Sequence, residues 1–259
     1  MSDRDARTHP MVRGFDREAR RYERARPGYP RASVRHLAKV LDLRRGRTIV
    51  ELGSGTGKFT RAILPTGAAV VAIEPTPGMR REFRRAVPEV ALLPGTAEAI
   101  PLPDGFADAV VAAQAFHWFR SRPALREIAR VLRPRGGLGL VWNTGDESFA
   151  VWRRIREVVE RYRSGSPRSR EHAWRAPFDR GTVPFDRLRE RRFRHAPVVR
   201  PEGLVERTLS VSVVAMLPPA ERRAVAREIR AILASDPATR GRASFRLPYW
   251  TEVYWTRRS

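Results

Sequence analysis

The stretch ELGSGTGKFT, residues 51–60, decides the fold of this chain. It follows the apolar run RTIVEL at 47–52 and leads into KFTRAILP at 58–65, so its glycines lie between a strand and a helix. Their spacing is G-x-G-x-G, whereas dinucleotide-binding folds use G-x-G-x-x-G. A P-loop is excluded as well, because Leu52 and Phe59 stand where it requires glycine and serine or threonine. Glycine lets a ligand approach the main chain closely, so we expect a binding loop for a ligand with a small polar end group.

Outward from this loop, apolar runs alternate with amphipathic stretches from residue 47 to residue 144. The runs that are apolar on both faces, as is typical of buried strands in a parallel sheet, are 47–52, 68–74, 89–95, 106–114 and 137–143. The amphipathic stretches that predict helices between them are 58–65, 77–87 and 121–132. Strand, helix and strand in sequence favour right-handed crossovers, so the chain is expected to form a doubly wound α/β domain.

The segments on both sides of this core predict further helices and a final pair of strands. The predicted helices cover 12–26, 30–43, 149–163, 204–209 and 219–233, and the aromatic tail at 243–258 predicts the strands. We therefore divide the chain into N-terminal lid helices (1–46), a core (47–145), a helical cap inserted before the last strands (146–240) and terminal strands that complete the core sheet (241–259).

Positive charge is concentrated outside the core. The chain has 259 residues, with 51 Lys and Arg against 28 Asp and Glu, and a formal net charge of +23. Residues 51–150 carry 12 basic and 10 acidic side chains, or +2, which leaves +21 on the flanking segments. Such a balance favours nucleic acid, an anionic membrane or an acidic ligand as partner. Because 49 of the 51 cations are arginine, a compositional bias without functional meaning is the alternative interpretation.

The composition also excludes several classes of site. The chain has no cysteine, which removes disulfides, thiolate metal sites and cysteine nucleophiles. The histidines outside the core, which have no metal-ligand spacing, are His9, His36, His172 and His195, so no metal site is expected. No apolar stretch approaches the roughly 18 residues needed to span a bilayer, and the charged start shows no signal peptide. A cytoplasmic protein without membrane contact is therefore expected.

Two acidic residues accompany the glycine loop. Glu74 ends the second predicted strand, 21 residues after Gly53, where a carboxylate can accept two hydrogen bonds from a ribose diol. Glu51, directly before the loop, suits a ligand that carries positive charge. Together the loop and the two acids predict a ligand that contains a nucleoside.

At these residues the chain resembles the class I S-adenosylmethionine-dependent methyltransferases. The similar motifs are ELGSGTGKFT, AIEPTPGM, GTAEAIPLPDGFADAVVAAQAFHWF and LREIARVLRPRGGLGLVWN, all within 47–143. Within that class it resembles the small-molecule "type 11" group, which includes trans-aconitate methyltransferase-like enzymes. The resemblance implies a Rossmann-like, mostly parallel seven-stranded sheet. It also implies S-adenosylmethionine as cofactor, S-adenosylhomocysteine as product and no metal.

The resemblance further implies which residues bind the cofactor. Those that would surround its methionine portion are Glu51, Gly53, Gly55 and Gly57. Those that would bind the adenosine are Glu74 at the ribose hydroxyls, Pro75 and Met79 beside the adenine, and Thr96, Ala97 and Glu98 at its amino group. Gln114 would lie near the methionine end, below the transferable methyl group.

His117 is the candidate residue for the chemistry. Methyl transfer is an in-line displacement, in which the protein positions the nucleophile and in some cases removes its proton. His117 follows the fourth predicted strand, at the end of the sheet that faces the ligand. We expect it to be either a general base or a packing residue below the cofactor. Trp118 and Trp142 are candidates for the substrate side, with core packing as the alternative.

The N-terminal segment supplies the remaining candidates. Phe15, Tyr22 and Arg26 are seven and four residues apart, so they share one face of a helix. Tyr22 and Tyr29 are expected to close over the cofactor as part of a lid. Arg26 either forms a bidentate contact with an anionic substrate or is solvated.

Three functions remain open at this point. The first is a methyltransferase for a small-molecule acceptor, modified at oxygen, nitrogen, carbon or a carboxylate and anionic if Arg26 pairs with it. The second is a nucleic-acid methyltransferase, favoured by the charge of +23. It is disfavoured by QAFHW at 114–118, which replaces the Asn/Asp-Pro-Pro-aromatic motif of enzymes that modify base amines. The third is an S-adenosylmethionine-binding protein without catalysis. We expect the first, with no nucleic-acid partner and with the oligomeric state unpredicted.

Overall fold

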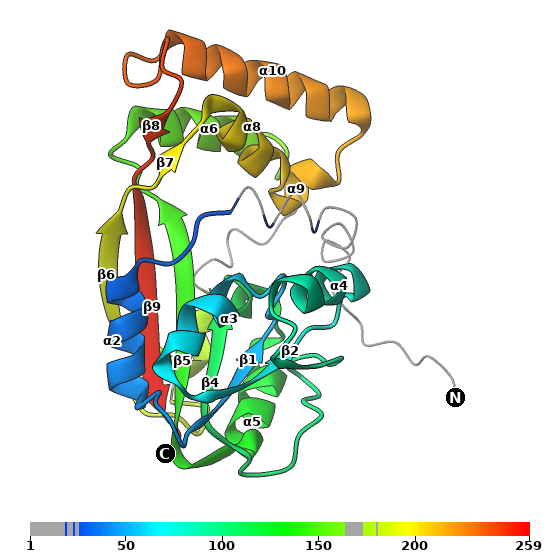
Figure 1. Cartoon of the computed structure of the whole chain (residues 1–259), viewed down its shortest axis with the longest axis vertical. Coiled ribbons are helices and arrows are strands. Elements are labelled where there is room, and N and C mark those ends of the chain that lie inside the picture. Colours follow the sequence, from blue (N-terminus) through cyan, green and yellow to red (C-terminus); the bar gives the residue numbers. More distant parts are fainter. Residues whose placement is uncertain (1–18, 20–22, 24–25, 164–172, 180) are drawn as a thin grey trace.

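The protein is built around one seven-stranded sheet with helices on both faces. The computed structural model describes residues 19, 23, 26–163, 173–179 and 181–259 (Figure 1). The sheet has the strand order β3-β2-β1-β4-β5-β9-β6. Its strands are β1 (Thr48–Leu52), β2 (Ala69–Ile73), β3 (Ala91–Leu93), β4 (Ala107–Ala113), β5 (Leu132–Gly145), β6 (Arg189–His195) and β9 (Tyr249–Arg257). The first five coincide with the five predicted runs and are parallel, while β9 is antiparallel to β5 and β6. The predicted doubly wound, mostly parallel fold is confirmed.

Alternate residues of each central strand point to opposite layers of the core. On β1, Ile49 packs with α2 (Arg31–Leu41) and α3 (Lys58–Ile63), and α4 (Pro77–Ala86) continues that layer over β2. Val50 faces the other layer, where α5 (Ser121–Val131) and α7 (Ala176–Asp179) lie. Both faces of the strand are buried, which explains why its sequence is mostly apolar.

Helix α2 lies directly on the sheet. A methyl group added to Gly139 of β5 would come within 2.8 Å of the side chains of Leu37 and Leu41 on this helix. The glycines of β5 therefore let the helix approach the strand closely. The first predicted helix, 12–26, falls outside the described residues except for Ala19, Glu23 and Arg26. Of the predicted lid helices (1–46), the second is α2, which packs on the sheet, and the first stays a prediction.

A separate helical layer forms the cap beyond the end of β5 (Figure 1). It contains α6 (Ala150–Glu160), α8 (Pro201–Leu209), α9 (Ser212–Ala215), α10 (Pro219–Ser235) and the short pair β7 (Val198–Val199) and β8 (Phe245–Arg246). These elements have a hydrophobic core of their own, centred on residues such as Ile155, Leu204 and Ile229. The remaining short segments are 3-10 turns at Leu64–Thr66, Phe116–Trp118 and Ala173–Arg175.

Two elements differ from the sequence prediction. The edge strand β6 was not predicted, because its sequence RERRFRH has no apolar alternation. Within the part of the chain that the structure describes it pairs only with β9, and charged side chains at such an edge hinder pairing with other chains. The tail was predicted to form a strand pair in the core sheet, but only β9 joins that sheet, and β8 pairs with β7 instead.

The junction between α5 and β5 also differs. The sequence predicted a helix that ends at 132 and a strand that begins at 137, whereas β5 begins at Leu132, directly after the helix. Its pairing with β4 shifts register between Ala107 and Ala109, so that Leu132 and Gly137 become successive partners. Arg135, inside this irregular segment, has a φ of 59°. The residues between Leu132 and Gly137 thus form a β-bulge, instead of a connection between the helix and the strand.

Candidate active site

The glycine loop follows β1 and holds three residues in left-handed conformations. Gly53, Gly55 and Gly57 have φ values of 64°, 57° and 80°. A methyl group on Gly53 would lie 2.7 Å from Cβ of Ala115, and one on Gly57 would lie 2.7 Å from a methyl of Val87. At Gly55 an added methyl would meet no protein atom within 4 Å. Two of the glycines are therefore required by packing, whereas Gly55 faces open space.

Two buried polar groups lie at the start of this loop. The side chain of Glu51 is buried, and one of its oxygens accepts a hydrogen bond of 2.6 Å from the hydroxyl of Thr60. Burial raises the pKa of Glu51 to about 8, and the neighbouring Glu74 adds to this rise. The hydroxyl of Ser54 is buried with no hydrogen-bond partner among the described residues. Both groups suit a ligand that brings a positive charge and a hydrogen-bonding atom.

Glu74 is tied to the loop from the end of β2. Its Oε2 accepts the main-chain N–H of Gly55 at 2.9 Å, and its Oε1 accepts the N–H of Thr76 at 2.9 Å and the Thr76 hydroxyl. Burial raises the pKa of Glu74, against these hydrogen bonds. Oε2 keeps a lone pair, since a carboxylate oxygen can accept two hydrogen bonds.

The residues predicted beside the adenine lie after β2 and β3, at the same end of the sheet. Met79 on α4 and Ala97 are buried. Thr96 forms a bridge to Ala99, and Glu98 accepts the main-chain N–H of Arg120 at 2.6 Å. The carbonyl of Pro75 accepts a hydrogen bond of 2.6 Å from Arg80. None of these five predicted residues is among the described residues that line the pocket at the glycine loop.

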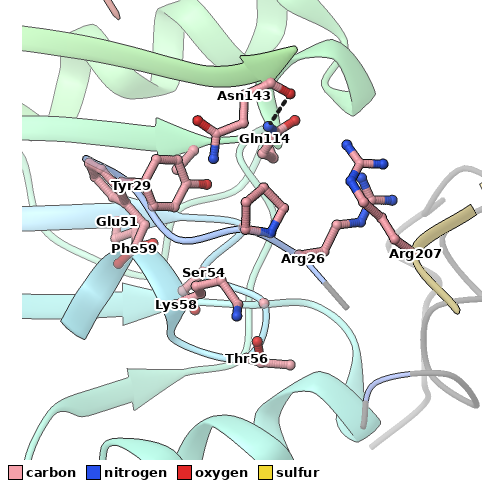
Figure 2. Close-up of a pocket in the computed structure, with 14 residues that line it drawn as sticks. Arg26, Tyr29, Glu51, Ser54, Thr56, Lys58, Phe59, Gln114, Asn143 and Arg207 are labelled. Carbon is pink, nitrogen blue, oxygen red and sulfur yellow. Dashed lines mark hydrogen bonds between the residues drawn. The ribbon is translucent and has the colours of Figure 1, made fainter. Parts of the chain in front are cut away.

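That pocket brings several of the other predicted residues together (Figure 2). The predicted residues that line it are Glu51, Gly53, Gly55, Gln114, Arg26 and Tyr29, and the lining residues that sequence reasoning missed are Pro27, Ser54, Thr56, Lys58, Phe59, Ala113, Asn143 and Arg207. Gly57 lies behind the loop as the N-cap of α3. Tyr22, predicted for the lid, lies outside the described residues.

The N-terminal segment contacts the loop through Glu23. Its carboxylate accepts hydrogen bonds from the hydroxyl of Thr56 and from Arg61, and its main-chain carbonyl accepts one of 2.7 Å from Nζ of Lys58. Farther along, the ring of Tyr29 meets that of Phe59 edge-on at 4.8 Å. The chain before α2 is thereby attached to the loop and to α3, as a lid requires.

Gln114 follows β4, and Asn143 lies near the end of the adjacent strand β5, at the centre of the sheet. Gln114 has a φ of 57°, uncommon for a residue other than glycine. Its Nε2 donates a hydrogen bond of 3.0 Å to the carbonyl of Asn143 (Figure 2). The Asn143 side chain donates to the carbonyl of Gly28 at 3.1 Å and accepts from Thr251 at 2.5 Å. Strained backbone of this kind is concentrated at functional sites, which supports a role for the Gln114 side chain.

A second cavity, of about 660 Å³, lies between the sheet and the cap. Its aromatic lining residues are Trp118, Trp142, Trp152, Trp174, Trp250 and Tyr254. Four residues, Arg26, Gln114, Asn143 and Arg207, line both this cavity and the pocket at the glycine loop. A molecule in the cavity can therefore meet a molecule bound at the loop.

Some arginines that line this cavity pair with an acidic side chain, whereas another packs against aromatic rings. Arg192 pairs with Glu252 at 3.3 Å, and Arg156 pairs with Glu147. Arg207 of α8 instead lies 4.8 Å from the ring centre of Trp152 and 5.2 Å from that of Tyr249. Its Nε is buried without a hydrogen-bond partner, and among the described residues it has no ion pair. Arg207 thus offers an uncompensated positive charge.

His117 and Trp142 both line the second cavity and contact each other. Nε1 of Trp142 donates a hydrogen bond of 3.2 Å to Nδ1 of His117. The surrounding protein lowers the pKa of His117 to about 4, first through loss of hydration and then through Arg26 and Arg163. Trp118, packed at 4.8 Å from the imidazole, lines the same cavity.

Two further observations concern the whole described chain. Across residues 26–163, 173–179 and 181–259, together with 19 and 23, no three His, Asp or Glu side chains gather as metal ligands would. No helix in these ranges combines the length and the apolar character that a membrane crossing needs.

The known proteins that resemble this chain are named as methyltransferases or methyltransferase-like proteins. A family model for the methyltransferase domain matches residues 50–140. An uncharacterised methyltransferase of Mycobacterium tuberculosis is 37% identical over 232 residues, which cover 89% of both chains. A methyltransferase-like protein of Schizosaccharomyces pombe is 33% identical over 244 residues, 94% of both chains. Among solved structures, a protein of Anaeromyxobacter dehalogenans proposed to be a type II methyltransferase is 25% identical. It aligns with a TM-score of 0.64 over 90% of this chain and 97% of that one.

Proposed function

The chain belongs to the class I S-adenosylmethionine-dependent methyltransferases of the type 11 group, and from this we propose that it methylates a small-molecule acceptor that carries negative charge. The observation that carries the proposal is the contact between the two pockets. Arg26, Gln114, Asn143 and Arg207 belong to the walls of both. An acceptor in the larger cavity would thus reach the methionine end of the cofactor at these residues.

The glycine loop fits this cofactor. A cationic ligand would stabilise the ionised form of the buried Glu51, and the unpartnered hydroxyl of Ser54 would gain a hydrogen bond. Gly55 leaves space beside the main chain, and Glu74 keeps a lone pair for a ribose hydroxyl. When bound, the cofactor supplies an activated methyl group on a sulfonium. We assign the methionine portion to Glu51, Ser54 and Gly55, and the ribose to Glu74.

The size and walls of the larger cavity support a small acceptor with a planar part. A volume of about 660 Å³ lies within the usual range for drug-sized ligands, roughly 300–1,000 Å³. Trp142 and Trp174 stack at 4.6 Å and offer a flat apolar wall. The demethylmenaquinone methyltransferase of Beutenbergia cavernae, 33% identical over 141 residues, is one relative whose acceptor is a small molecule. That match covers 52% of this chain and 58% of the relative.

Arg207 supports a negative charge on the acceptor. Its guanidinium lies against two aromatic rings and has no ion pair among the described residues, so it can pair with a carboxylate or another oxyanion. Figure 2 shows its side chain and that of Arg26 extending toward the same part of the pocket. An acceptor oxygen that arrives ionised has a lone pair ready for the methyl group and no proton to be removed.

The arginines of β6 argue against the nucleic-acid alternative. Arg192 lies over Trp250 at 4.8 Å, Arg194 pairs with Asp146 at 2.8 Å, and Arg191 lies over Phe193 at 5.4 Å. These three side chains already have partners within the protein. Part of the high positive charge thus has a structural explanation that involves no phosphate backbone.

One experiment tests the proposed acceptor class. The protein is incubated with S-adenosylmethionine carrying a deuterated methyl group, and with aromatic carboxylic acids and their matched neutral amides. We expect S-adenosylhomocysteine to form with at least one acid, and the labelled methyl group to appear on that acid but not on its amide. Transfer to total RNA alone would favour the nucleic-acid alternative. Cofactor binding without transfer to acids, amides or RNA would favour a non-catalytic protein.

The Arg207→Met variant and a matched control refine this test. Methionine keeps apolar contact with Trp152 but removes the charge, so we expect the preference for acids to fall at least tenfold. Arg200→Met is the control, because Arg200 begins the same helix and is exposed. It should leave the preference unchanged.

A further inference from the structure

The hydrogen bond between Trp142 and His117 fixes where the imidazole carries its proton. An indole N–H can only donate, so Nδ1 of His117 must accept with its lone pair. An imidazole that accepts at Nδ1 is neutral and carries its single proton on Nε2. His117 is therefore held in the Nε2–H form.

Trp142 is itself held in place, so this hydrogen bond does not depend on a mobile donor. Its ring stacks on Trp174 with an interplanar angle of 24° and meets Tyr254 edge-on at 5.6 Å. Trp142 lies on β5, and Trp174 lies in the segment before α7. The indole nitrogen is thus aimed by packing from two separate segments.

The charges around His117 favour the same neutral form. Arg26 and Arg163 both lower the pKa of the imidazole, which falls to about 4 because the ring also loses hydration. A base must accept a proton at a nitrogen that has a free lone pair, but the lone pair of Nδ1 is used and Nε2 already carries hydrogen. Proton uptake would break the bond from Trp142 and place a third cation beside two arginines.

The free N–H is available to the cavity. Although protein surrounds the ring, its surface is accessible from the cavity, and Nε2 has no hydrogen-bond partner among the described residues. We propose that His117 donates a hydrogen bond from Nε2 to an oxygen of the methyl acceptor, and that it positions the acceptor instead of removing its proton. This proposal rests on the function proposed above, because it concerns the acceptor of the same site.

The first test observes the imidazole directly, in the free protein. Long-range proton–nitrogen NMR spectra of the nitrogen-labelled chain distinguish the two neutral forms of histidine, and the His117→Gln variant assigns the signals. We expect the Nε2–H form, unchanged from about pH 8 down to about pH 5.5. The Trp142→Phe variant keeps a ring against Trp174 but lacks the N–H, so the Nδ1–H form should appear as well. An Nδ1–H form in the unmodified protein, or titration near pH 6.5, would overturn the proposal.

The second test compares two amide replacements of His117. Glutamine places its N–H₂ near the position of Nε2, whereas asparagine places it near Nδ1, and neither is a base. The probe is 2-naphthoate with S-adenosylhomocysteine present, followed by tryptophan fluorescence. We expect His117→Gln to bind the probe within about threefold of the unmodified protein, and His117→Asn at least tenfold more weakly, as for a lost hydrogen bond to a charged group. Equal loss in both variants would contradict the donor role.

The two proposals fail in different ways. If S-adenosylhomocysteine does not bind the unmodified protein in a calorimetric titration, the proposed function fails, whatever the NMR spectra show. If it binds while His117 titrates near its ordinary pKa, the donor role fails and the methyltransferase assignment is unaffected.

Discussion

The main-chain N–H of Gly55 donates a 2.9 Å hydrogen bond to Oε2 of Glu74, and so joins the loop after β1 to the end of β2. The two segments predicted to bind opposite parts of the cofactor are therefore in contact before any ligand arrives. Glu74 would therefore contribute to cofactor affinity twice, by ordering the loop in advance and by the proposed contact to the ribose.

Replacing Glu74 should weaken cofactor binding strongly. The Glu74→Ala variant loses the acceptor for Gly55, the acceptor for Thr76 and the proposed contact to the ribose. Hydrogen bonds to charged groups contribute about 1.5–3 kcal/mol each, so we expect affinity for S-adenosylhomocysteine to fall about 10- to 100-fold or more. Isothermal titration calorimetry measures this. Glu89→Ala, at an exposed acid after α4, is the control, and an equal loss there would refute the assignment.

The buried Glu51 should make stability fall as pH rises. Its pKa is about 8 in the folded protein and 4.5 for the unperturbed group, so between these values the folded state holds more protons than the unfolded state. The free energy of unfolding then decreases with increasing pH across this window. Glu51→Gln removes the effect, so Tm of the variant relative to the unmodified protein should rise from about pH 5 to about pH 8. Parallel Tm curves would contradict the raised pKa.

The same group should couple cofactor binding to proton release. A cationic ligand favours the ionised carboxylate, so Glu51 should lose a proton when S-adenosylhomocysteine, which carries an ammonium group, binds near pH 7. Calorimetry in buffers of different ionisation enthalpy counts the released protons. Release should disappear in Glu51→Gln, while weaker binding is expected from the lost charge. An unchanged proton count in the variant would assign the release to another group.

Two alanine substitutions in the loop should have different effects. In Gly57→Ala the new methyl group would lie 2.7 Å from Val87 and 3.0 Å from Phe83, so we expect a loss of stability of about 2–4 kcal/mol from overpacking and left-handed strain. Gly55→Ala meets no protein atom within 4 Å and should cost only about 1–2 kcal/mol. Its methyl group would enter the cofactor pocket, however, and should abolish measurable binding. Urea unfolding and a titration with S-adenosylhomocysteine separate the two effects, and the reverse ranking would refute the geometry.

Glu23 should control how firmly the N-terminal segment covers the loop. Its carboxylate accepts hydrogen bonds from Thr56 and Arg61. A partly exposed network of this kind contributes modestly to stability. We expect Glu23→Gln to weaken S-adenosylhomocysteine binding about three- to tenfold, mainly through a faster dissociation rate, with little change in Tm. Stopped-flow displacement measures that rate. A large fall in Tm with an unchanged rate would show that Glu23 stabilises the fold and not a lid.

The core of the fold could be predicted from the sequence because its central strands, β1 and β4, are buried on both faces. Runs such as 68–74 and 106–114 are mostly apolar, and the glycine loop marks where the first strand ends. Strand β6 could not be predicted, since its arginines are stabilised by Trp250, Glu252 and Asp146, which are distant in sequence. Alternation of residue type carries no information about such partners.

The site was predictable where one motif supplies it and unpredictable where several segments meet. The loop acids and glycines are adjacent in sequence, and the structure brings Glu51, Gly53 and Gly55 to one pocket. Arg207 is one arginine among 49, and nothing in its neighbours indicates that α8 turns it toward the loop. Asn143 was within a predicted strand, but its contacts to Gly28 and Thr251 depend on the completed sheet.

The position of β9 sets the order in which this protein can be completed in the cell. The strand lies between β5 and β6, although it comes after the whole cap in sequence. While the chain is being synthesised, the apolar edge of β5 thus has no neighbour until Arg257 has left the ribosome. An unpaired edge of this kind can associate with other nascent chains, and chaperones protect such intermediates. Closure of the sheet must therefore follow synthesis of the whole cap, and the larger cavity, whose wall includes Trp250 and Tyr254, forms only then.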